Sequence, residues 1–283
     1  MRVLVFGKTG QVATELQRFD GVTALGREEA DLNDTAVCMN IIAQTDADVV
    51  INAAAYTGVD AAETDSDKTF RVNSDAPTAM AYAAAKRPLP FLHISTDYVF
   101  DGSGVTPWLE DASPSPLGVY GASKLASEQG VRAAGGPHAI LRTSWVVSAH
   151  GGNFVKTMLR LGAERDALNI VADQIGGPTC ARDIATTLMN MARQLVENPS
   201  KSGTYHFAGT PDVSWADFAR EIFIQADITC DVSDIPSSAY PTPAARPANS
   251  RLECSKVNTI FDINRPDWRV GLADILSELK VGS

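Results

Sequence analysis

A tyrosine and a lysine four residues apart are the side chains in this sequence best suited to acid/base chemistry. Tyr120 and Lys124 stand in the segment Tyr-Gly-Ala-Ser-Lys, which is typical of a helix. Residues at i and i+4 share one helix face, so the Lys124 ammonium can lie near the Tyr120 phenol. A nearby cation favours the phenolate and lowers the phenol pKa from about 10 toward the working pH. The pair therefore predicts a proton donor, although an exposed pair on an ordinary helix has the same spacing.

A glycine-rich turn near the start of the chain predicts a dinucleotide site. The apolar run 2–6 suits a buried parallel strand, and Gly7, Gly10 and Ala13 follow it in a turn that leads into helical spacing. In such a unit, glycines let the backbone approach a diphosphate, whose charge lies at the helix N-terminus. Ala13 at the third small position is compatible, because only close helix-to-sheet packing is required there.

The rest of the chain must hold these two groups together, and its pattern predicts an α/β fold. Apolar strand-like runs alternate with helical stretches, which favours a Rossmann-type doubly wound parallel sheet. We expect a dinucleotide-binding domain over 1–145, completed by about 170–200, and a smaller C-terminal substrate-binding lobe from 146–169 and 201–283. The further predicted strands are 22–25, 48–51, 91–94 and 139–142, with a helix over 77–86 and proline-rich loops over 102–118 and 235–249. His93 lies inside one of these strands and is expected to be a hydrogen-bonded core residue.

Composition narrows the class of protein. The 283 residues are 45% hydrophobic, which is enough for a sizeable core, and no apolar run approaches the length of a membrane span. A net charge of −10 disfavours nucleic acid and anionic membranes as partners. The N-terminus leads straight into a strand without a charged n-region or cleavage site, so we expect a cytoplasmic location. The four cysteines are far apart without a C-x-x-C pair, so we expect reduced thiols. An anionic substrate would need a local basic pocket.

The residue after the second strand bears on the choice of cofactor. Ligands bind outside the carboxyl ends of parallel strands, where an acid would bind the ribose 2′-hydroxyl of NAD and a cation the 2′-phosphate of NADP. Arg27 occupies that place. It favours NADPH, although Glu28 and Glu29 beside it could partly neutralise its charge.

Four motifs in this order resemble the extended short-chain dehydrogenase/reductases: Gly7-x-x-Gly10-x-x-Ala13, 52–55, 95–102 and Tyr120-x-x-x-Lys124. More narrowly, the chain is similar to the dTDP-4-dehydrorhamnose reductase family in segments 7–12, 141–146, 153–155, 173–176 and 246–252. The likeness runs from residue 3 to residue 252. It implies NADPH-dependent reduction of the 4-keto group of dTDP-4-dehydro-L-rhamnose to dTDP-L-rhamnose, with NADH as an alternative reductant.

The resemblance also implies the role of each residue. Tyr120 would protonate the carbonyl oxygen, Lys124 would lower the Tyr120 pKa and hold the nicotinamide ribose, and Thr96 would polarise the carbonyl. The implied cofactor-binding set is Gly7, Gly10, Gln11, Val12, Arg27, Asp31, Leu32, Ala53, Ala54, Ala55, Tyr120 and Lys124. The implied substrate-binding set is Thr96, Asp97, Tyr98, Trp145 and Arg246. Three of these have ordinary alternatives: a turn or helix cap for Asp31, core packing for Trp145 and a solvated loop charge for Arg246.

The metal question depends on one departure from the family. Some members are described as magnesium-bridged dimers built on three glutamates, and Glu15 and Glu278 fall where two of them are expected. The third place is Arg182, beside Asp183. A cation there would oppose Mg²⁺, so we predict no metal, treat both glutamates as weak candidates, and leave monomer and homodimer open.

Other functions on the same fold can be weighed on residues. Sugar-nucleotide 4,6-dehydratases carry Thr-Asp-Glu where this chain has Thr96-Asp97-Tyr98, so elimination lacks its general base. A 4-epimerase or a reductase of a related deoxysugar would keep Tyr120 and Lys124. A non-catalytic NADP-binding regulatory subunit would be expected to lose part of this set, which is complete here.

Overall fold

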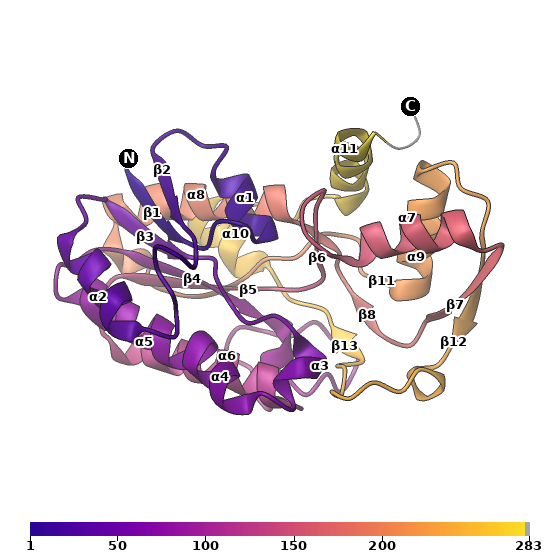
Figure 1. Ribbon diagram of the computed structural model, residues 1–283, viewed down its shortest axis with the longest axis horizontal. Helices are drawn as coiled ribbons and strands as arrows, with labels where there is room; N and C mark the ends of the chain where they lie inside the picture. The colour runs from indigo at the N-terminus through magenta and orange to yellow at the C-terminus, as the bar shows by residue number, and fades with distance from the viewer. Residues whose placement is uncertain (281–283) are drawn as a thin grey trace.

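Six parallel strands form the central sheet of the computed structural model, which describes residues 1–280. The strands lie in the order β10-β5-β4-β3-β1-β2 (Figure 1). From β1 the chain passes to β2 on one side and then returns to β3 on the other, so the order reverses between β1 and β3. Ligands bind at such a reversal, outside the carboxyl ends of the strands. The strands are β1 Val3–Phe6, β2 Val22–Leu25, β3 Val49–Asn52, β4 Phe91–Thr96, β5 His138–Thr143 and β10 Gly203–His206.

Both faces of this sheet are buried, because its strands are apolar at successive positions. Val3 and Val5 point to the layer formed by α1, α8 and α10, whereas Leu4 and Phe6 point to the layer formed by α2, α5 and α6. Figure 1 shows these layers above and below the sheet. The helices are α1 Gln11–Leu16, α2 Thr35–Gln44, α5 Ala76–Ala85, α6 Val119–Ala133, α8 Ala181–Glu197 and α10 Ser255–Phe261.

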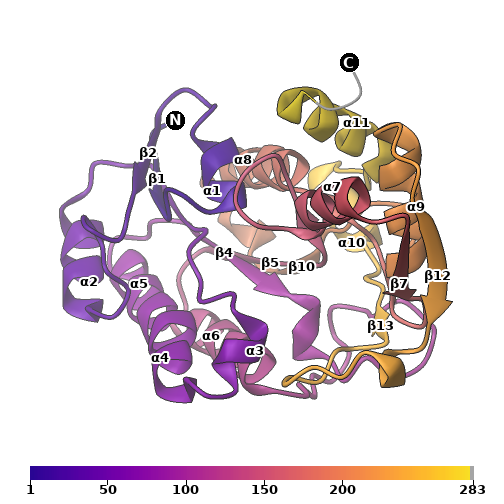
Figure 2. The same cartoon turned by 45° about the vertical axis from the view of Figure 1, so that its right-hand side comes forward.

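A second apolar core lies in the smaller lobe. It is built on α7 Phe154–Glu164, α9 Trp215–Gln225 and α11 Trp268–Leu279, with the paired strands β7 Ala167–Val171 and β12 Asp231–Ile235. Figure 2 brings this side of the molecule forward. The short strands β6 Val146–Val147, β8 Ile175–Gly176, β9 Thr179–Cys180, β11 Val213–Ser214 and β13 Asn249–Ser250 connect the two parts.

Irregular helical segments precede the predicted proton donor in the chain. Helix α3 spans Val59–Ala62, and α4 Ser66–Phe70 continues through the π-helical segment η1 Arg71–Asp75 into α5. Single π turns inside helices occur often at functional sites. Three 3₁₀ turns are η2 Asp97–Val99, η3 Pro199–Lys201 and η4 Ser237–Ala239.

The doubly wound parallel sheet predicted from the sequence is confirmed, and each predicted strand is present within two residues of its expected bounds. One boundary differs. Strand β10 pairs with β5, and α10 packs against the sheet in the same layer as α1 and α8, although the expected division assigned 201–283 to the smaller lobe. Strand β10 is short and follows the long helix α8, so its own sequence did not show which lobe it joins. Its position is set by pairing with β5, which is distant in sequence. Within residues 1–280, no helix combines the length and apolar character that a membrane crossing requires.

Candidate active site

Tyr120 lies beside the end of β4 because a glycine follows it. Gly121 is buried against η2, and a Cβ atom at this position would overlap the Tyr98 carbonyl oxygen. Helix α6 therefore approaches η2 more closely than a larger residue would permit. The rings of Tyr98 and Tyr120 meet edge to face, with their centroids 5.5 Å apart. The structure thus brings Tyr120 together with the segment that contains Thr96 and Asp97.

Tyr120 remains a phenol at neutral pH in this environment. Burial, together with the charge of Asp97, raises the pKa of Tyr120 to about 12, and a hydrogen bond with the Thr96 side chain opposes both effects. A protonated phenol can donate to an oxygen atom. Burial likewise raises the pKa of Asp97 to about 6.

Thr96 is placed for a hydrogen bond, but its proton is already engaged. The Thr96 hydroxyl donates to Asp97 Oδ1 at 3.0 Å and accepts from the Tyr98 backbone N–H at 3.2 Å. Donation to a ligand oxygen therefore requires rotation of this one hydroxyl. Asp97 is almost fully buried, so it acts on the site through Thr96 and through its charge.

The structure does not show the predicted lowering of the Tyr120 pKa by Lys124. Lys124 Nζ donates to the Ile94 carbonyl oxygen at 2.7 Å and lies 3.1 Å from His93 Nε2, on the inner side of α6. The groups that shift the Tyr120 pKa do not include Lys124. Burial lowers the pKa of Lys124 itself to about 7, against the raising effect of Glu128. Desolvation is therefore the main cause of both shifts: it raises the pKa of Tyr120 and lowers that of Lys124.

A cavity of ≈ 1220 Å³ opens between the two lobes. Tyr120 and Lys124 are not among its lining residues, but Tyr98, whose ring contacts that of Tyr120, is. The cavity is lined by three of the predicted substrate-binding residues, Tyr98, Trp145 and Arg246. Its other walls come from α7, β7, η4 and the loop before β13. Such a volume accommodates a ligand much larger than a single sugar.

Trp145 is both packed and exposed to the cavity. Its ring stacks on Trp215 with centroids 3.5 Å apart, and its backbone φ of 49° is left-handed. A bulky residue in this region of φ is strained and persists where its surroundings demand it. The predicted alternatives for Trp145, core packing and ligand contact, therefore coexist.

Arg246 lines the cavity as an ion pair. Its guanidinium donates to Asp60 Oδ2 at 2.7 Å and to the Ala244 carbonyl oxygen at 3.0 Å. Asp60, on α3, also accepts from the Ala244 backbone N–H at 3.1 Å. The predicted basic pocket is thus present with a carboxylate beside it, and the proline-rich loop is fastened to α3.

The glycine turn meets the end of β3 on the other side of the sheet reversal. Gly7 has a φ of 112°, and a Cβ there would lie 3.2 Å from the Ala53 carbonyl carbon and the Ala54 nitrogen. Only glycine combines this φ with such a close approach. Helix α1 begins at Gln11 directly after Gly10, so backbone N–H groups face outward at the strand ends. These features fit a dinucleotide diphosphate.

The side chains around this turn face in different directions. Val12 is buried in the core, so only its backbone is available. The Gln11 amide reaches the other way: it donates to the Val146 carbonyl oxygen at 3.4 Å and accepts from Ser148 at 2.8 Å and Asn153 at 3.1 Å. Ala55 is half-buried after β3.

The predicted adenine-side residues adopt a turn after β2. Asp31 Oδ1 accepts from the Asn33 backbone and side chain at 3.0 and 2.8 Å, which matches the turn alternative. Arg27 is largely exposed and lies 3.5 Å from Asp31 Oδ2, so most of its guanidinium is accessible. Leu32 is buried beneath the turn.

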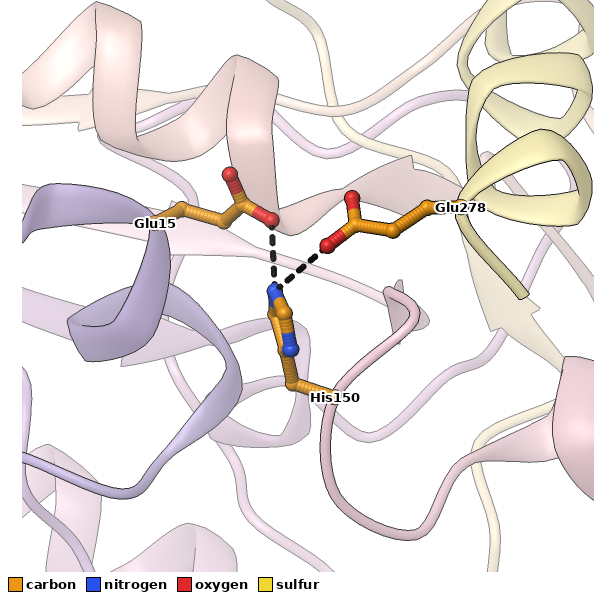
Figure 3. A group of neighbouring side chains, drawn as sticks. All are labelled: Glu15, His150 and Glu278. Carbon is orange, nitrogen blue, oxygen red and sulfur yellow. Dashed lines mark hydrogen bonds and ion pairs between the residues drawn. The ribbon is translucent and has the colours of Figure 1, made fainter. Parts of the chain in front are cut away.

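Glu15, His150 and Glu278 converge where α1, the loop after β6 and α11 meet (Figure 3). His150 Nε2 lies 3.0 Å from Glu15 Oε1 and 3.6 Å from Glu278 Oε1. Arg182 reaches both carboxylates, at 3.5 Å for Glu15 and 3.1 Å for Glu278. Arg18 does the same, at 3.0 and 2.5 Å. Two guanidiniums thus balance the two carboxylates, and this set does not fit Mg²⁺, which prefers oxygen ligands free of competing cations.

The thermal midpoint of unfolding is therefore expected to be the same with Mg²⁺ and with a chelator. Arginine already neutralises the carboxylates, so neither addition changes the charge balance of the cluster. Differential scanning fluorimetry and light scattering measure the midpoint and the oligomeric state. A midpoint or a mass that depends on Mg²⁺ would show that the cation displaces Arg18 and Arg182.

Several residues at the site were not predicted from the sequence. Trp215 and Asp60 line the cavity, and buried Asn73 in η1 accepts from the Tyr56 backbone N–H at 2.7 Å and donates to Ser123 at 3.1 Å. Their partners are distant in sequence, so no local motif marks them. The asparagine in a helix interior was the one local signal, because asparagine is a poor helix former.

A family model described as "RmlD substrate binding domain" matches residues 1–281. The dTDP-4-dehydrorhamnose reductase of Sinorhizobium fredii (strain NBRC 101917 / NGR234) is 45% identical to the chain over 278 residues, which cover 95% of the chain and 94% of that protein. The Escherichia coli (strain K12) enzyme of the same name is 40% identical, covering 99% and 98%. A crystal structure of dTDP-4-dehydrorhamnose reductase from Bacillus anthracis in complex with NADP has a TM-score of 0.91 at 33% identity, covering 98% of this chain and 99% of that one.

Proposed function

We propose that the chain reduces dTDP-4-dehydro-L-rhamnose to dTDP-L-rhamnose, because it belongs to the RmlD substrate binding domain family. Its curated relatives are dTDP-4-dehydrorhamnose reductases, which are NAD(P)H-dependent oxidoreductases. The observation that carries this proposal is the position of Tyr120, a neutral phenol whose ring contacts Tyr98 in the wall of the cavity between the lobes. A ketone that enters the cavity can meet this proton on one side and the dinucleotide site on the other.

We assign a separate role in this reduction to each residue of the site. Tyr120 donates its proton to the 4-keto oxygen, and Thr96 supports the same oxygen after its hydroxyl rotates away from Asp97. Trp145 and Tyr98 offer aromatic faces to the deoxysugar. Arg246 binds the anionic diphosphate of the sugar nucleotide, since a guanidinium matches phosphate oxygens.

The cofactor we propose is NADPH. Its diphosphate would lie on the turn from Gly7 to Val12, its 2′-phosphate at Arg27 and its nicotinamide ribose at Lys124. When bound, it supplies the hydride for the reduction. The Bacillus anthracis relative in complex with NADP supports this choice.

One experiment tests the reaction directly. The purified chain is incubated with NADPH, dTDP-4-keto-6-deoxyglucose and a 3,5-epimerase, and the product sugar is identified by NMR. dTDP-L-rhamnose, with one NADPH oxidised per sugar, is the expected result. A sugar product formed without net oxidation at 340 nm would identify a 4-epimerase, and NADPH binding without any product would identify a regulatory subunit.

Arg27→Ala is expected to reduce the preference for NADPH over NADH. The loss of one exposed charge-assisted contact to the 2′-phosphate corresponds to about tenfold in kcat/KM for NADPH. The value for NADH should change little, because NADH has no phosphate there. Steady-state assays with both cofactors measure the ratio, and an unchanged ratio would exclude Arg27 from the 2′-phosphate site.

Arg246→Ala is expected to raise the substrate KM with a smaller change in kcat. Arg246 is remote from the reacting carbonyl, so it stabilises the bound substrate and the transition state alike. A charged hydrogen bond of about 1.5–3 kcal/mol corresponds to a KM increase of roughly 10- to 100-fold. Arg265→Ala is the matched control, because Arg265 forms a similar ion pair with Asp212 away from the cavity walls.

The proposed reaction also bears on the location and the oligomeric state of the protein. We propose a cytoplasmic enzyme, where NADPH and sugar nucleotides are available, that acts as a monomer or homodimer. The four cysteines are free thiols.

A further inference from the structure

A chain of buried hydrogen bonds lies behind Lys124 and connects it to the end of β3. His93 is the centre of this chain, and its Nδ1 lies 3.1 Å from Asn52 Nδ2. Its Nε2 lies 2.9 Å from Ser127 Oγ and 3.1 Å from Lys124 Nζ. His93 and Ser127 are completely buried, and Asn52 and Lys124 nearly so. The reduction proposed above uses Lys124 alone among these four.

Asn52 decides which nitrogen of His93 carries the proton. Asn52 Oδ1 accepts from the Ala54 backbone N–H at 3.2 Å, and this contact turns Nδ2 toward the imidazole. An amide nitrogen only donates, so His93 Nδ1 must accept. A neutral imidazole has one proton, which therefore lies on Nε2. Burial, and secondarily the charge of Lys124, lower the His93 pKa well below its ordinary value and keep the ring neutral.

Ser127 Oγ accepts a hydrogen bond from the protonated Nε2 of His93. Its hydroxyl donates to the Lys124 backbone carbonyl at 2.6 Å, which leaves its lone pairs to accept from the imidazole. A protonated Nε2 cannot accept, so Lys124 Nζ does not donate to it, whatever the charge of the lysine. Within residues 1–280, the remaining acceptor for Nζ is the Ile94 carbonyl oxygen, at 2.7 Å. In the ammonium form, two of the three N–H groups of Lys124 therefore have no partner among residues 1–280.

We propose that His93, held by Asn52, is a positioning residue for Lys124: the neutral ring covers the inner side of the ammonium without accepting from it. Lys124 then keeps two N–H groups for the nicotinamide ribose, so this inference rests on the proposed function. An acceptor at the same place would give Lys124 a second inward partner and draw it away from the ribose.

The tautomer is tested first, on the wild-type chain. Two-dimensional ¹H–¹⁵N NMR of the imidazoles distinguishes a protonated Nε2 from a protonated Nδ1. The chain has four histidines, and the signal lost in His93→Gln identifies that of His93. A protonated Nε2 is expected, and a protonated Nδ1 would overturn the proposal. This measurement needs neither substrate nor a functional variant, so it does not depend on the proposed reaction.

Two substitutions then separate positioning from packing. His93→Gln places an amide oxygen, which is a hydrogen-bond acceptor, near the position of the protonated Nε2. His93→Phe keeps an aromatic ring and offers no acceptor. We expect His93→Gln to weaken NADPH binding about tenfold, the size of one weakened charged hydrogen bond. It should also lower kcat about a hundredfold through misplacement of Lys124. His93→Phe should stay within a few-fold of the wild type in both, although it leaves Asn52 Nδ2 without a partner.

A purely structural histidine predicts the opposite order, with His93→Phe the more damaged variant. NADPH affinity is measured by fluorescence titration, without the sugar, so a chain that reduces a different sugar still gives a result. His206→Gln is the matched control: His206 is equally buried in β10 but contacts Arg142 and Trp108. It should lose stability and keep its NADPH affinity. Equal NADPH affinities for His93→Gln and His93→Phe would overturn the proposal.

Discussion

Replacing Tyr120 with phenylalanine is expected to lower kcat by ~10²- to 10⁴-fold, the usual contribution of one positioned proton donor. Phenylalanine keeps the ring that packs edge-on against Tyr98 and removes only the hydroxyl. NADPH affinity should therefore change little, since the glycine turn and Arg27 are untouched. Stopped-flow assays of NADPH oxidation and fluorescence titration of the cofactor measure the two quantities separately.

Tyr98→Phe is the matched control for this substitution. Tyr98 is half-buried like Tyr120, and desolvation is the main cause that raises its pKa above the ordinary value, but Tyr98 lines the cavity wall and does not lie on α6. Its hydroxyl is expected to affect substrate KM more than kcat. If Tyr98→Phe lost the larger share of kcat, the proton donor would be Tyr98, and the assignment of Tyr120 would be wrong.

Replacing Glu128 with glutamine is expected to destabilise the fold by about 3–5 kcal/mol, because it leaves a buried arginine without its counter-charge. Glu128 follows Lys124 by one turn of α6 and is completely buried. It accepts from Arg142 at 2.8 and 2.7 Å, from Ser95 at 2.6 Å and from Arg132 at 3.3 Å. Chemical denaturation followed by circular dichroism measures the free energy of unfolding.

Two further variants make this prediction specific. Glu164→Gln removes an exposed carboxylate paired with Arg160 and should cost no more than about 0.5 kcal/mol. Replacing Glu128 and Arg142 together with apolar residues of similar size should recover much of the loss, since neither charge is then buried alone. A single Glu128→Gln variant as stable as Glu164→Gln would mean that water reaches this pair.

The same pair predicts how stability depends on pH. Burial raises the pKa of Glu128, but the hydrogen bonds and charge of Arg142 outweigh this and hold it below its ordinary value of 4.5. The folded state therefore binds this proton less readily than the unfolded state. The contribution of Glu128 is fully present above about pH 4.5 and is lost as the pH falls through the lower value in the folded protein.

The amino-acid sequence by itself determined the parts of this protein that are local. The apolar runs predicted the strands β1 to β5, because a strand buried on both faces is continuously apolar. Gly7 and Gly10 predicted the turn after β1, because their backbone conformation is specified within a few residues. The spacing of Tyr120 and Lys124 placed both on one helix face.

Only the tertiary structure decided what those residues touch. The Lys124 ammonium turns toward Ile94 and His93 instead of Tyr120, since the buried acceptor that holds it comes from another strand. The pairing of β10 with β5 and the ion pair of Arg246 with Asp60 likewise join segments far apart in the chain. Hydrogen bonds and charges act over a few ångströms in space, whatever the separation in sequence, so motifs could indicate these residues but not their partners.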